Sequence, residues 1–335
     1  MKTNYQFMKP ILKWMTFLVI AITAVSCQEA PKKEQKNDLK IGVQTWSFRT
    51  MKDQTPLAIL NYIKESGVKY VELMGNHAES FAGAPESPMN DPKVMPVLYK
   101  RYYKQELNEE EQAIATQYEI DQKIYEEELA EWHRNVDYGK FEELKNLYAE
   151  AGISIFAFKP SVFGKESTED AIRYGMRAAK ALGASHVTLE HPEDDAHTAR
   201  LAMLAEEEGI LVGYHGHEQQ TPVLWDSAMA QSDANRMNLD FGHYVAAEND
   251  NLLGFVKEKS EKIVSMHLKD RQKKSNGGGN LMWGTGDTPI KEVVQLIANN
   301  NYGFPVTIEV EYEIPEGSSA VEEVKRCLEY IKNSL

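Results

Sequence analysis

Short apolar runs alternate with longer amphipathic stretches from about residue 40 to the end of the chain. Eight of these runs are rich in Val, Ile and aromatic residues, a composition typical of buried strands. They are IGVQTW, YVELM, ISIFAFK, HVTLE, ILVGYH, MNLDF, IVSMHL and PVTIEVE. The stretches between them predict helices: in 171–184, for example, apolar or small residues recur three or four positions apart. The pattern therefore predicts a repeated unit of one strand and one helix.

The regular alternation of strand and helix indicates one parallel sheet covered by helices. Eight units favour closure into a (β/α)8 TIM barrel over an open doubly wound sheet, and no GxGxxG motif follows the first strand. Thr55 and Thr288, each of which precedes a proline, are typical of helix starts, as is Ser167 with Asp170 three positions later. We expect these hydroxyl groups to cap the N-termini of their helices.

One connection breaks the rhythm, because nearly eighty residues separate YVELM from ISIFAFK. A structureless loop of that length is improbable in a compact domain. We therefore expect a helical insertion at about 85–131, followed by the ordinary second helix at 132–151. Because the insertion leaves the carboxyl end of a strand, it should overhang the barrel mouth, as a lid, an oligomer contact or a solvated decoration.

The N-terminus has the features of an export signal. Lysines precede the apolar run 14–25, which ends in small residues before Cys27. This end resembles a bacterial lipoprotein signal, and the alternatives are an ordinary secretory signal or an uncleaved anchor helix. We expect a signal peptide at 1–26, lipidation of Cys27, a flexible tether at 27–38 and the barrel at 39–335. The protein would then be exported and anchored to a membrane through its lipid.

The chain is acidic, with a formal net charge of −14 over 335 residues. Because phosphate backbones require basic surfaces, we expect no nucleic-acid partner. Hydrophobic residues make up 42% of the chain, enough for a substantial core. A small molecule is the expected partner, and self-association into a homo-oligomer is left open. Cys327 falls on the apolar face of the last predicted helix, so we expect a buried structural thiol.

Polar residues end several of the predicted strands. The fourth, sixth, seventh and eighth strands supply, in that order, Glu190, Asp240, His267 and Glu309. The carboxyl ends of barrel strands converge on one pocket, where three carboxylates would repel one another without a compensating charge. Taken singly, each residue could cap a helix or form local hydrogen bonds. Together they predict a site for a divalent cation.

A ligand set of three oxygen atoms and one nitrogen atom suits Mn²⁺, Mg²⁺ or Co²⁺. Zn²⁺ also fits, although the set lacks the thiolates of thiolate-rich zinc sites. Positive side chains close to the same strand ends could offset the remaining charge or bind substrate oxygens. These are Lys159, Lys269 and Arg271.

Several of these segments resemble the xylose isomerase-like TIM barrels, particularly the sugar isomerase/epimerase group that includes inosose dehydratases and ketose 3-epimerases. The segments are TLE, LDFGH, HLKDR, TIEVE and WGTGDTP, and the resemblance runs from about residue 39 to the C-terminus. It implies that Glu190, Asp240, His267 and Glu309 bind the metal. It also implies substrate contacts from His243 and Arg271, and it matches His215 and His217 to a histidine-containing fifth strand.

The chemistry expected of such a site begins with removal of a proton beside a metal-bound carbonyl, which gives an enediolate. Glu190 and Glu309 are the candidate acid–base pair, and Lys159 is a further candidate substrate contact. We expect isomerisation or epimerisation of a non-phosphorylated keto-sugar or keto-glycoside.

Two alternatives use the same barrel. One is a lyase, dehydratase or hydratase that acts on a 3-keto sugar, and the other is a non-catalytic sugar-binding lipoprotein. The barrel also supports AP endonucleases, but those use additional histidines, and here the third strand ends in Lys159.

Overall fold

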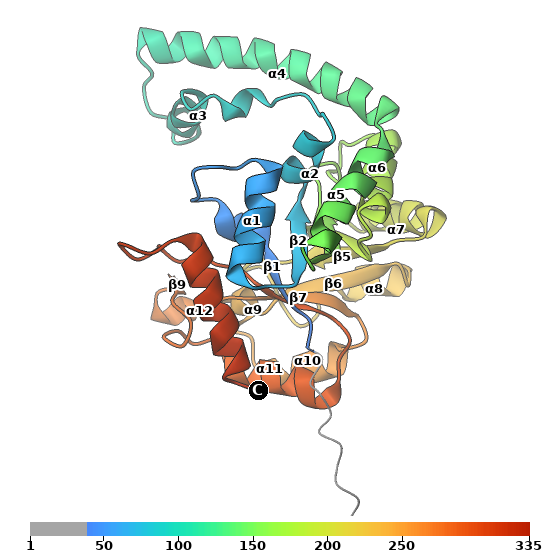
Figure 1. Cartoon of the computed structure of the whole chain (residues 1–335), viewed down its shortest axis with the longest axis vertical. Coiled ribbons are helices and arrows are strands. Elements are labelled where there is room, and N and C mark those ends of the chain that lie inside the picture. The colour runs from blue at the N-terminus through green and yellow to red at the C-terminus, as the bar shows by residue number, and fades with distance from the viewer. Residues whose placement is uncertain (1–38) are drawn as a thin grey trace, which may run out of the picture. The chain divides into compact units, whose positions relative to one another are not determined.

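Eight parallel strands close into a barrel in the computed structural model, which describes residues 39–335 (Figure 1). The strands are β1 (Ile41–Gln44), β2 (Tyr70–Met74), β3 (Ser154–Lys159), β4 (His186–Glu190), β5 (Leu211–His215), β6 (Asn235–Asp240), β7 (Ile263–Leu268) and β10 (Val306–Ile308). Each strand pairs with its neighbours in chain order, and β10 closes the barrel against β1. The predicted TIM barrel is confirmed.

Helices follow the strands and cover the outside of the barrel. They are α1 (Pro56–Ser66), α5 (Tyr138–Glu150), α6 (Glu169–Ala181), α7 (Asp195–Glu208), α8 (Asp226–Gln231), α10 (Leu252–Lys259), α11 (Ile290–Asn300) and α12 (Ala320–Lys332). The core lies between these helices and the strands, and one contiguous cluster of buried apolar side chains fills it. Cys327 is buried on α12. The helical faces that the sequence pattern predicts are thus the faces that pack on the sheet.

The predicted helix caps meet different outcomes. Thr55 caps α1, since its hydroxyl oxygen accepts from the backbone N–H of Ala58. The cap of α6 is Thr168 and not Ser167. Thr288 does not cap α11; its hydroxyl oxygen accepts from the backbone N–H of Arg271 at 3.0 Å. The loop before α11 folds back onto the segment after β7, and that contact takes the hydroxyl away from the helix.

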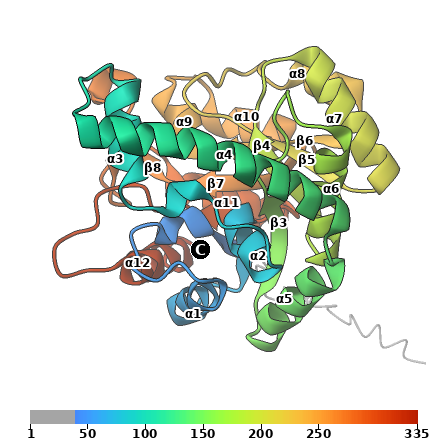
Figure 2. The same cartoon turned by 90° about the horizontal axis from the view of Figure 1, so that it is seen from above.

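The long connection between β2 and β3 is helical. It contains α2 (Gly75–Phe81), a 3-10 turn (Pro88–Asn90), α3 (Val94–Tyr102) and α4 (Glu109–Asn135), and α5 returns to the sheet. Asn108 and Glu111 form a reciprocal capping box at the start of α4. Figure 2 shows α4 running across the end of the barrel, above α2 and α3 in the view of Figure 1. The segment at 85–131, where we expected an insertion, therefore holds the 3-10 turn, α3 and most of α4.

The predicted signal peptide, the lipidation site Cys27 and the tether lie outside the described residues. Within 39–335, no helix combines the length and the apolar character that a membrane crossing requires.

Candidate metal and active site at the barrel mouth

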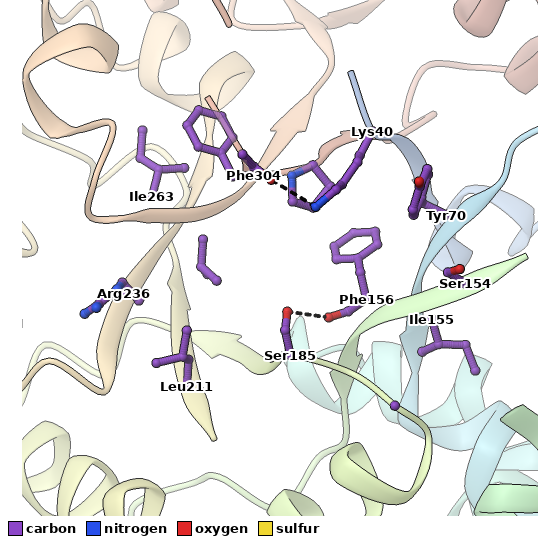
Figure 3. Close-up of a pocket in the computed structure, with 14 residues that line it drawn as sticks. Lys40, Tyr70, Ser154, Ile155, Phe156, Ser185, Leu211, Arg236, Ile263 and Phe304 are labelled. Atoms are coloured by element: carbon purple, nitrogen blue, oxygen red, sulfur yellow. Dashed lines mark hydrogen bonds between the residues drawn. The ribbon is translucent and has the colours of Figure 1, made fainter. Parts of the chain in front are cut away.

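The barrel has a hollow at each end, and the chemistry-bearing side chains lie at only one of them. The hollow at the amino ends of the strands has a volume of about 440 Å³ (Figure 3). Phe156, Ile155 and Phe304 line it together with Lys40 and Arg236, and its lining includes no carboxylate or imidazole. Barrel enzymes place their sites at the carboxyl ends of the strands. All the candidate residues predicted from the sequence within the described part of the chain lie at or near that opposite end.

Three of the four predicted metal ligands lie together: Asp240 and Glu309 contact one ammonium group, and His267 contacts Glu309. His267, near the end of β7, places Nδ1 2.9 Å from Glu309 Oε2. Lys269 Nζ lies 2.8 Å from the same Glu309 oxygen and 3.0 Å from Asp240 Oδ2. It also lies 2.6 Å from Glu311 Oε2. Asp240, His267, Lys269 and Glu309 are all buried, so their charges act on one another with little screening by solvent.

Glu72, on β2, is a member of the site that sequence reasoning missed. Its Oε2 atom lies 2.6 Å from His267 Nε2, and its Oε1 atom accepts from the Thr188 hydroxyl at 2.7 Å. Burial alone would raise the pKa of Glu72, but His267 beside it holds that pKa at about 2. A carboxylate behind an imidazole commonly orients a metal-binding histidine. The signal was available in the run YVELM, where one carboxylate interrupts an otherwise apolar strand.

His267 lies between two carboxylates and is held in its charged form. Burial lowers the pKa of an imidazole, but the negative charges of Glu72 and Glu309 outweigh burial and raise the pKa of His267 to about 10. With Nε2 directed to Glu72, Nδ1 is the nitrogen that faces the other candidate ligands. Loss of the Nδ1 proton would make that nitrogen available to a cation.

Asp240 ends β6 and has two oxygen atoms with different environments. Oδ1 accepts from the backbone N–H of His243 at 2.7 Å and so caps α9 (Phe241–Ala246). Oδ2 is buried, and although Lys269 Nζ is 3.0 Å away, no donor within residues 39–335 meets it with hydrogen-bond geometry. Burial would raise the pKa of Asp240, yet Lys269 and the neighbouring imidazoles keep it low. An ionised and incompletely satisfied oxygen is the donor that a divalent cation requires.

His215, at the end of β5, connects this cluster to the remaining predicted ligand. One ligand atom from each of His215, Asp240 and His267 lies within 4.8 Å of the others. The same distance holds for the group formed by Glu190, His215 and His217. Burial, followed by the charge of Lys159, lowers the pKa of His215 to about 4, which leaves its ring neutral. Its Nδ1 donates to Asn238 Oδ1 at 2.6 Å, so Nε2 carries the free lone pair.

Glu190 stands at the outer edge of the site, with its side chain 48% exposed. It contacts Lys159 Nζ at 2.7 Å and lies 3.5 Å from His217 Nδ1. Burial raises the pKa of Glu190, but His215 and Lys159 bring it to about 2. Asp240, His267 and Glu309 therefore form one cluster, and Glu190 lies beside it, with His215 between Glu190 and the other three.

The two predicted substrate contacts His243 and Arg271 lie side by side. An Arg271 guanidinium nitrogen is 2.6 Å from His243 Nδ1, and the other terminal nitrogen donates to Glu218 Oε1 at 2.6 Å. Burial lowers the pKa of His243 to about 3, so its Nδ1 is a neutral acceptor. The His243 ring also packs edge-on against His217, with centroids 4.7 Å apart.

The charged side chains at the barrel mouth have a net negative charge, which a divalent cation would reduce. Lys159, Lys269 and a protonated His267 supply three positive charges. The carboxylates around them are Glu72, Glu190, Asp240, Glu309 and Glu311. The balance is −2 with His267 protonated, and it becomes −3 once His267 loses the Nδ1 proton that keeps this nitrogen from binding a cation. The donor set therefore fits Mn²⁺, Mg²⁺ or Co²⁺, as oxygen-rich sites with an imidazole do.

Comparisons with known proteins agree with this architecture. The model of the Xylose isomerase-like TIM barrel family matches residues 115–332, which is more than half of the chain. No curated protein matches the chain significantly.

Three solved structures illustrate the shared fold. A sugar phosphate isomerase/epimerase from Parabacteroides distasonis is 16% identical, with a TM-score of 0.54 over 87% of this chain and 93% of that one. A probable 3-DHS dehydratase from Bacillus anthracis is 14% identical, with a TM-score of 0.57 over 88% and 99%. A 3-keto-D-glucoside 4-epimerase from E. coli is 13% identical, with a TM-score of 0.56 over 88% and 99%.

Proposed function

Because the chain belongs to the Xylose isomerase-like TIM barrel family, we propose that it is a divalent-metal-dependent isomerase or epimerase of a non-phosphorylated keto-sugar or keto-glycoside. The observation that carries the proposal is the buried cluster of Asp240, His267 and Glu309. The side chains at the mouth together carry a net negative charge, and among the described residues Asp240 Oδ2 has no hydrogen-bond donor with good geometry. Burying charged groups in a barrel interior costs stability. A catalytic role explains why the barrel keeps them.

Asp240, His267 and Glu309 would hold the cation, with Glu190 as the fourth ligand. A bound divalent cation would polarise the substrate carbonyl and lower the pKa of the proton on the neighbouring carbon. Glu72 would fix the ring of His267 through Nε2, and Asn238 would fix the ring of His215 through Nδ1. Glu72 and Asn238 thus act as positioning residues.

Glu190 and Glu309 would move the substrate proton. Both carboxylates are ionised at neutral pH, because nearby Lys and His side chains hold the pKa of each below its usual range against the effect of burial. An ionised carboxylate can accept a carbon-bound proton and return it on the same face, as isomerisation requires. Epimerisation would need both groups, with one carboxylate removing the proton and the other returning a proton to the opposite face. Lys159, which contacts Glu190, would donate a hydrogen bond to a substrate oxygen.

The substrate is proposed to lack a phosphate because the nearby cations already have anionic partners. Lys159 pairs with Glu190, Lys269 pairs with three carboxylates, and Arg271 pairs with Glu218. A phosphate would require unpaired cations or a helix N-terminus directed at it. A keto-glycoside is also the kind of molecule named for the 3-keto-D-glucoside 4-epimerase that shares the fold.

Solvent-deuterium exchange tests the function. The full chain is stripped of metal with a chelator, Mn²⁺ is restored, and exchange into a panel of keto-sugars and keto-glycosides is followed by mass spectrometry. We expect exchange in the wild type and a loss of about 10²- to 10⁴-fold in Glu309→Gln, the range typical of a lost proton-transfer group. The exposed Glu313→Gln variant is the matched control and should exchange normally.

The products and the metal content separate the alternatives. Exchange that ends in an eliminated or hydrated product would reassign the enzyme to the lyases or hydratases. Sugar binding without exchange would indicate a non-catalytic binding protein. Full activity in protein that elemental analysis shows to be free of metal would refute the metal dependence.

We further propose that the protein is an exported lipoprotein with its lipid on Cys27. The proposal rests on the basic and apolar sequence before that cysteine. Labelling cells with radioactive palmitate should mark the wild type and not Cys27→Ser, and the variant should leave the membrane fraction.

A further inference from the structure

A second cavity lies between the helical insertion and the carboxyl ends of β1 to β3. Its volume is about 700 Å³, within the range of roughly 300–1,000 Å³ typical of small-molecule sites. The barrel side contributes Thr45, Trp46 and Met74, and the insertion contributes Tyr125 and His133 among others. The insertion thus forms one wall of a cavity, which a solvated decoration would not do.

The cavity is continuous with the candidate active site. Lys159 lines it and also contacts Glu190 Oε1 at 2.7 Å. Met74 and Ser161 line both this cavity and the smaller pocket that contains Glu190. A ligand whose reacting end lies at Glu190 could therefore extend past Lys159 into the space under α4.

Two imidazoles that line the cavity have nitrogen atoms without hydrogen-bond partners among the described residues. They are Nδ1 of His77, which is 96% buried, and Nε2 of His133. The His133 ring stacks on Tyr174 with centroids 4.2 Å apart, so its orientation is fixed by packing. Buried polar atoms are nearly always satisfied, so these two nitrogens call for a polar partner at the cavity, which water or a ligand hydroxyl group would supply.

The remaining lining groups suit a neutral ligand that is rich in hydroxyl groups. Glu79 accepts a hydrogen bond from the Tyr174 hydroxyl at 3.1 Å, and Asn76, Asn90 and Ser87 add amide and hydroxyl groups. The Arg49 guanidinium donates to the backbone carbonyl of Val310 at 2.6 Å and lies over the ring of Trp46. Lys159 is paired with Glu190, and the Arg49 guanidinium is bonded to backbone carbonyls, so neutral polar groups make up most of the remaining polar lining.

We propose that this cavity binds a second sugar ring, joined by a glycosidic bond to the ring that reacts at Glu190. The inference rests on the proposed function and narrows its substrate class to keto-disaccharides and related glycosides. Hydroxyl groups can both donate to and accept from neutral imidazoles, amides and a carboxyl group, as the lining requires. The partly exposed Trp46 ring offers an apolar face for the sugar.

Calorimetric titration of the full chain tests the subsite with named probes. Cellobiose, maltose, lactose, sucrose and trehalose are compared with glucose. At least one disaccharide should bind about tenfold more tightly than glucose, and His133→Phe should lose about five- to tenfold in that affinity while glucose binding is unchanged. One net hydrogen bond corresponds to a factor of that size. Phenylalanine preserves the stacking on Tyr174 and removes Nε2.

Two further variants serve the test. Lys123→Ala, on an exposed part of α4, is the matched control and should bind like the wild type. If His133→Phe melts at a lower temperature than the wild type, Asn90→Ala replaces it, because Asn90 lines the cavity from an exposed position. Either variant with a selective loss of disaccharide binding supports the proposal.

The subsite is overturned if no disaccharide binds more tightly than glucose, or if the lining variant binds disaccharides like the wild type. Failure of the proposed function is a separate result, because it appears as absent deuterium exchange in the wild type with every keto-sugar. Exchange together with equal binding of mono- and disaccharides would thus reject the subsite alone.

Discussion

Glu79, on α2 beneath the insertion, should make the stability of the protein fall as the pH rises. Burial raises the pKa of this carboxyl from 4.5 to about 7, against the lowering effect of the Tyr174 hydroxyl. Between these two pH values the folded protein keeps a proton on Glu79 that the unfolded chain has lost. The stabilising contribution of protonated Glu79 is therefore fully present below pH 4.5 and is lost as the pH rises toward 7.

The size of the decline follows from the pKa difference. Each pKa unit corresponds to about 1.4 kcal/mol in the free energy of unfolding. The shift of the Glu79 pKa from 4.5 to about 7 therefore lowers the free energy of unfolding by about 3 kcal/mol above pH 7. His77 and His133 act in the opposite direction, since burial lowers the pKa of each to about 4 and stability rises as the unfolded imidazoles lose their protons. The nearby hydroxyls of Tyr125 and Tyr174 titrate above this range.

The comparison of wild type with Glu79→Gln isolates the carboxyl, because the imidazole contributions are common to both proteins. Glutamine keeps the shape of the side chain and can still accept from the Tyr174 hydroxyl. Urea unfolding, followed by tryptophan fluorescence in the presence of a chelator, gives the free energy of unfolding at each pH. The variant should gain about 3 kcal/mol relative to the wild type between pH 4.5 and 7. Parallel curves for the two proteins would refute the argument.

Further substitutions test other parts of the structure. Glu72→Gln removes the carboxylate behind His267 and should weaken Mn²⁺ binding about 10- to 100-fold, measured by competition with a chromophoric chelator; unchanged affinity would show that Glu72 has no orienting role. Gly242→Ala places a Cβ atom 2.7 Å from the Lys269 carbonyl oxygen and should cost about 1–3 kcal/mol in urea unfolding; stability equal to the wild type would mean that the backbone yields there. Asn108→Ala removes the cap of α4 and should cost about 1 kcal/mol, seen as faster amide exchange in its first turn.

The barrel could be predicted because its strands and helices have the periodicity of buried elements throughout. Local details were harder to predict where tertiary contacts compete for the same group. Thr288 precedes a proline as a helix cap would, yet its hydroxyl accepts from the backbone of Arg271. Asp270, the residue before Arg271, accepts from the backbone N–H groups of Gly284, Thr285 and Gly286 and so holds the loop against the segment after β7. Such a contact between distant segments has no local sequence signal.

The candidate site could be predicted in part for a similar reason. Residues at strand ends converge in any barrel, so the proximity of Asp240, His267 and Glu309 followed from topology. Lys269 was expected to offset charge at these strand ends, but its individual contacts with Asp240 and Glu309 could not be predicted, because they depend on how a long side chain folds back into the mouth. Glu72 was missed because it lies in the middle of its strand, where a carboxylate is unusual.

The polar side chains inside the barrel show which group donates and which accepts in the hydrogen bonds behind the site. Asn238 Nδ2 donates to Ser265 Oγ, so the Ser265 hydroxyl must use its own proton toward His186 Nε2, 2.9 Å away. His186, which burial keeps neutral, then carries its proton on Nδ1, which faces Ser185. The Ser185 hydroxyl donates to the Phe156 carbonyl oxygen at the amino end of the barrel (Figure 3).

The same hydrogen bonds determine which ring nitrogen of His215, at the barrel mouth, carries the proton. The series of hydrogen bonds begins at His215, continues through Asn238, Ser265, His186 and Ser185, and ends at the carbonyl oxygen of Phe156. The Asn238 amide oxygen can only accept a hydrogen bond, so His215 must hold its proton on Nδ1. Its Nε2 lone pair therefore faces the Asp240 side of the cluster, 3.8 Å from Oδ2. A polar column through the barrel, with each hydrogen bond satisfied, thus presents a neutral nitrogen where a cation or a substrate hydroxyl would need an acceptor.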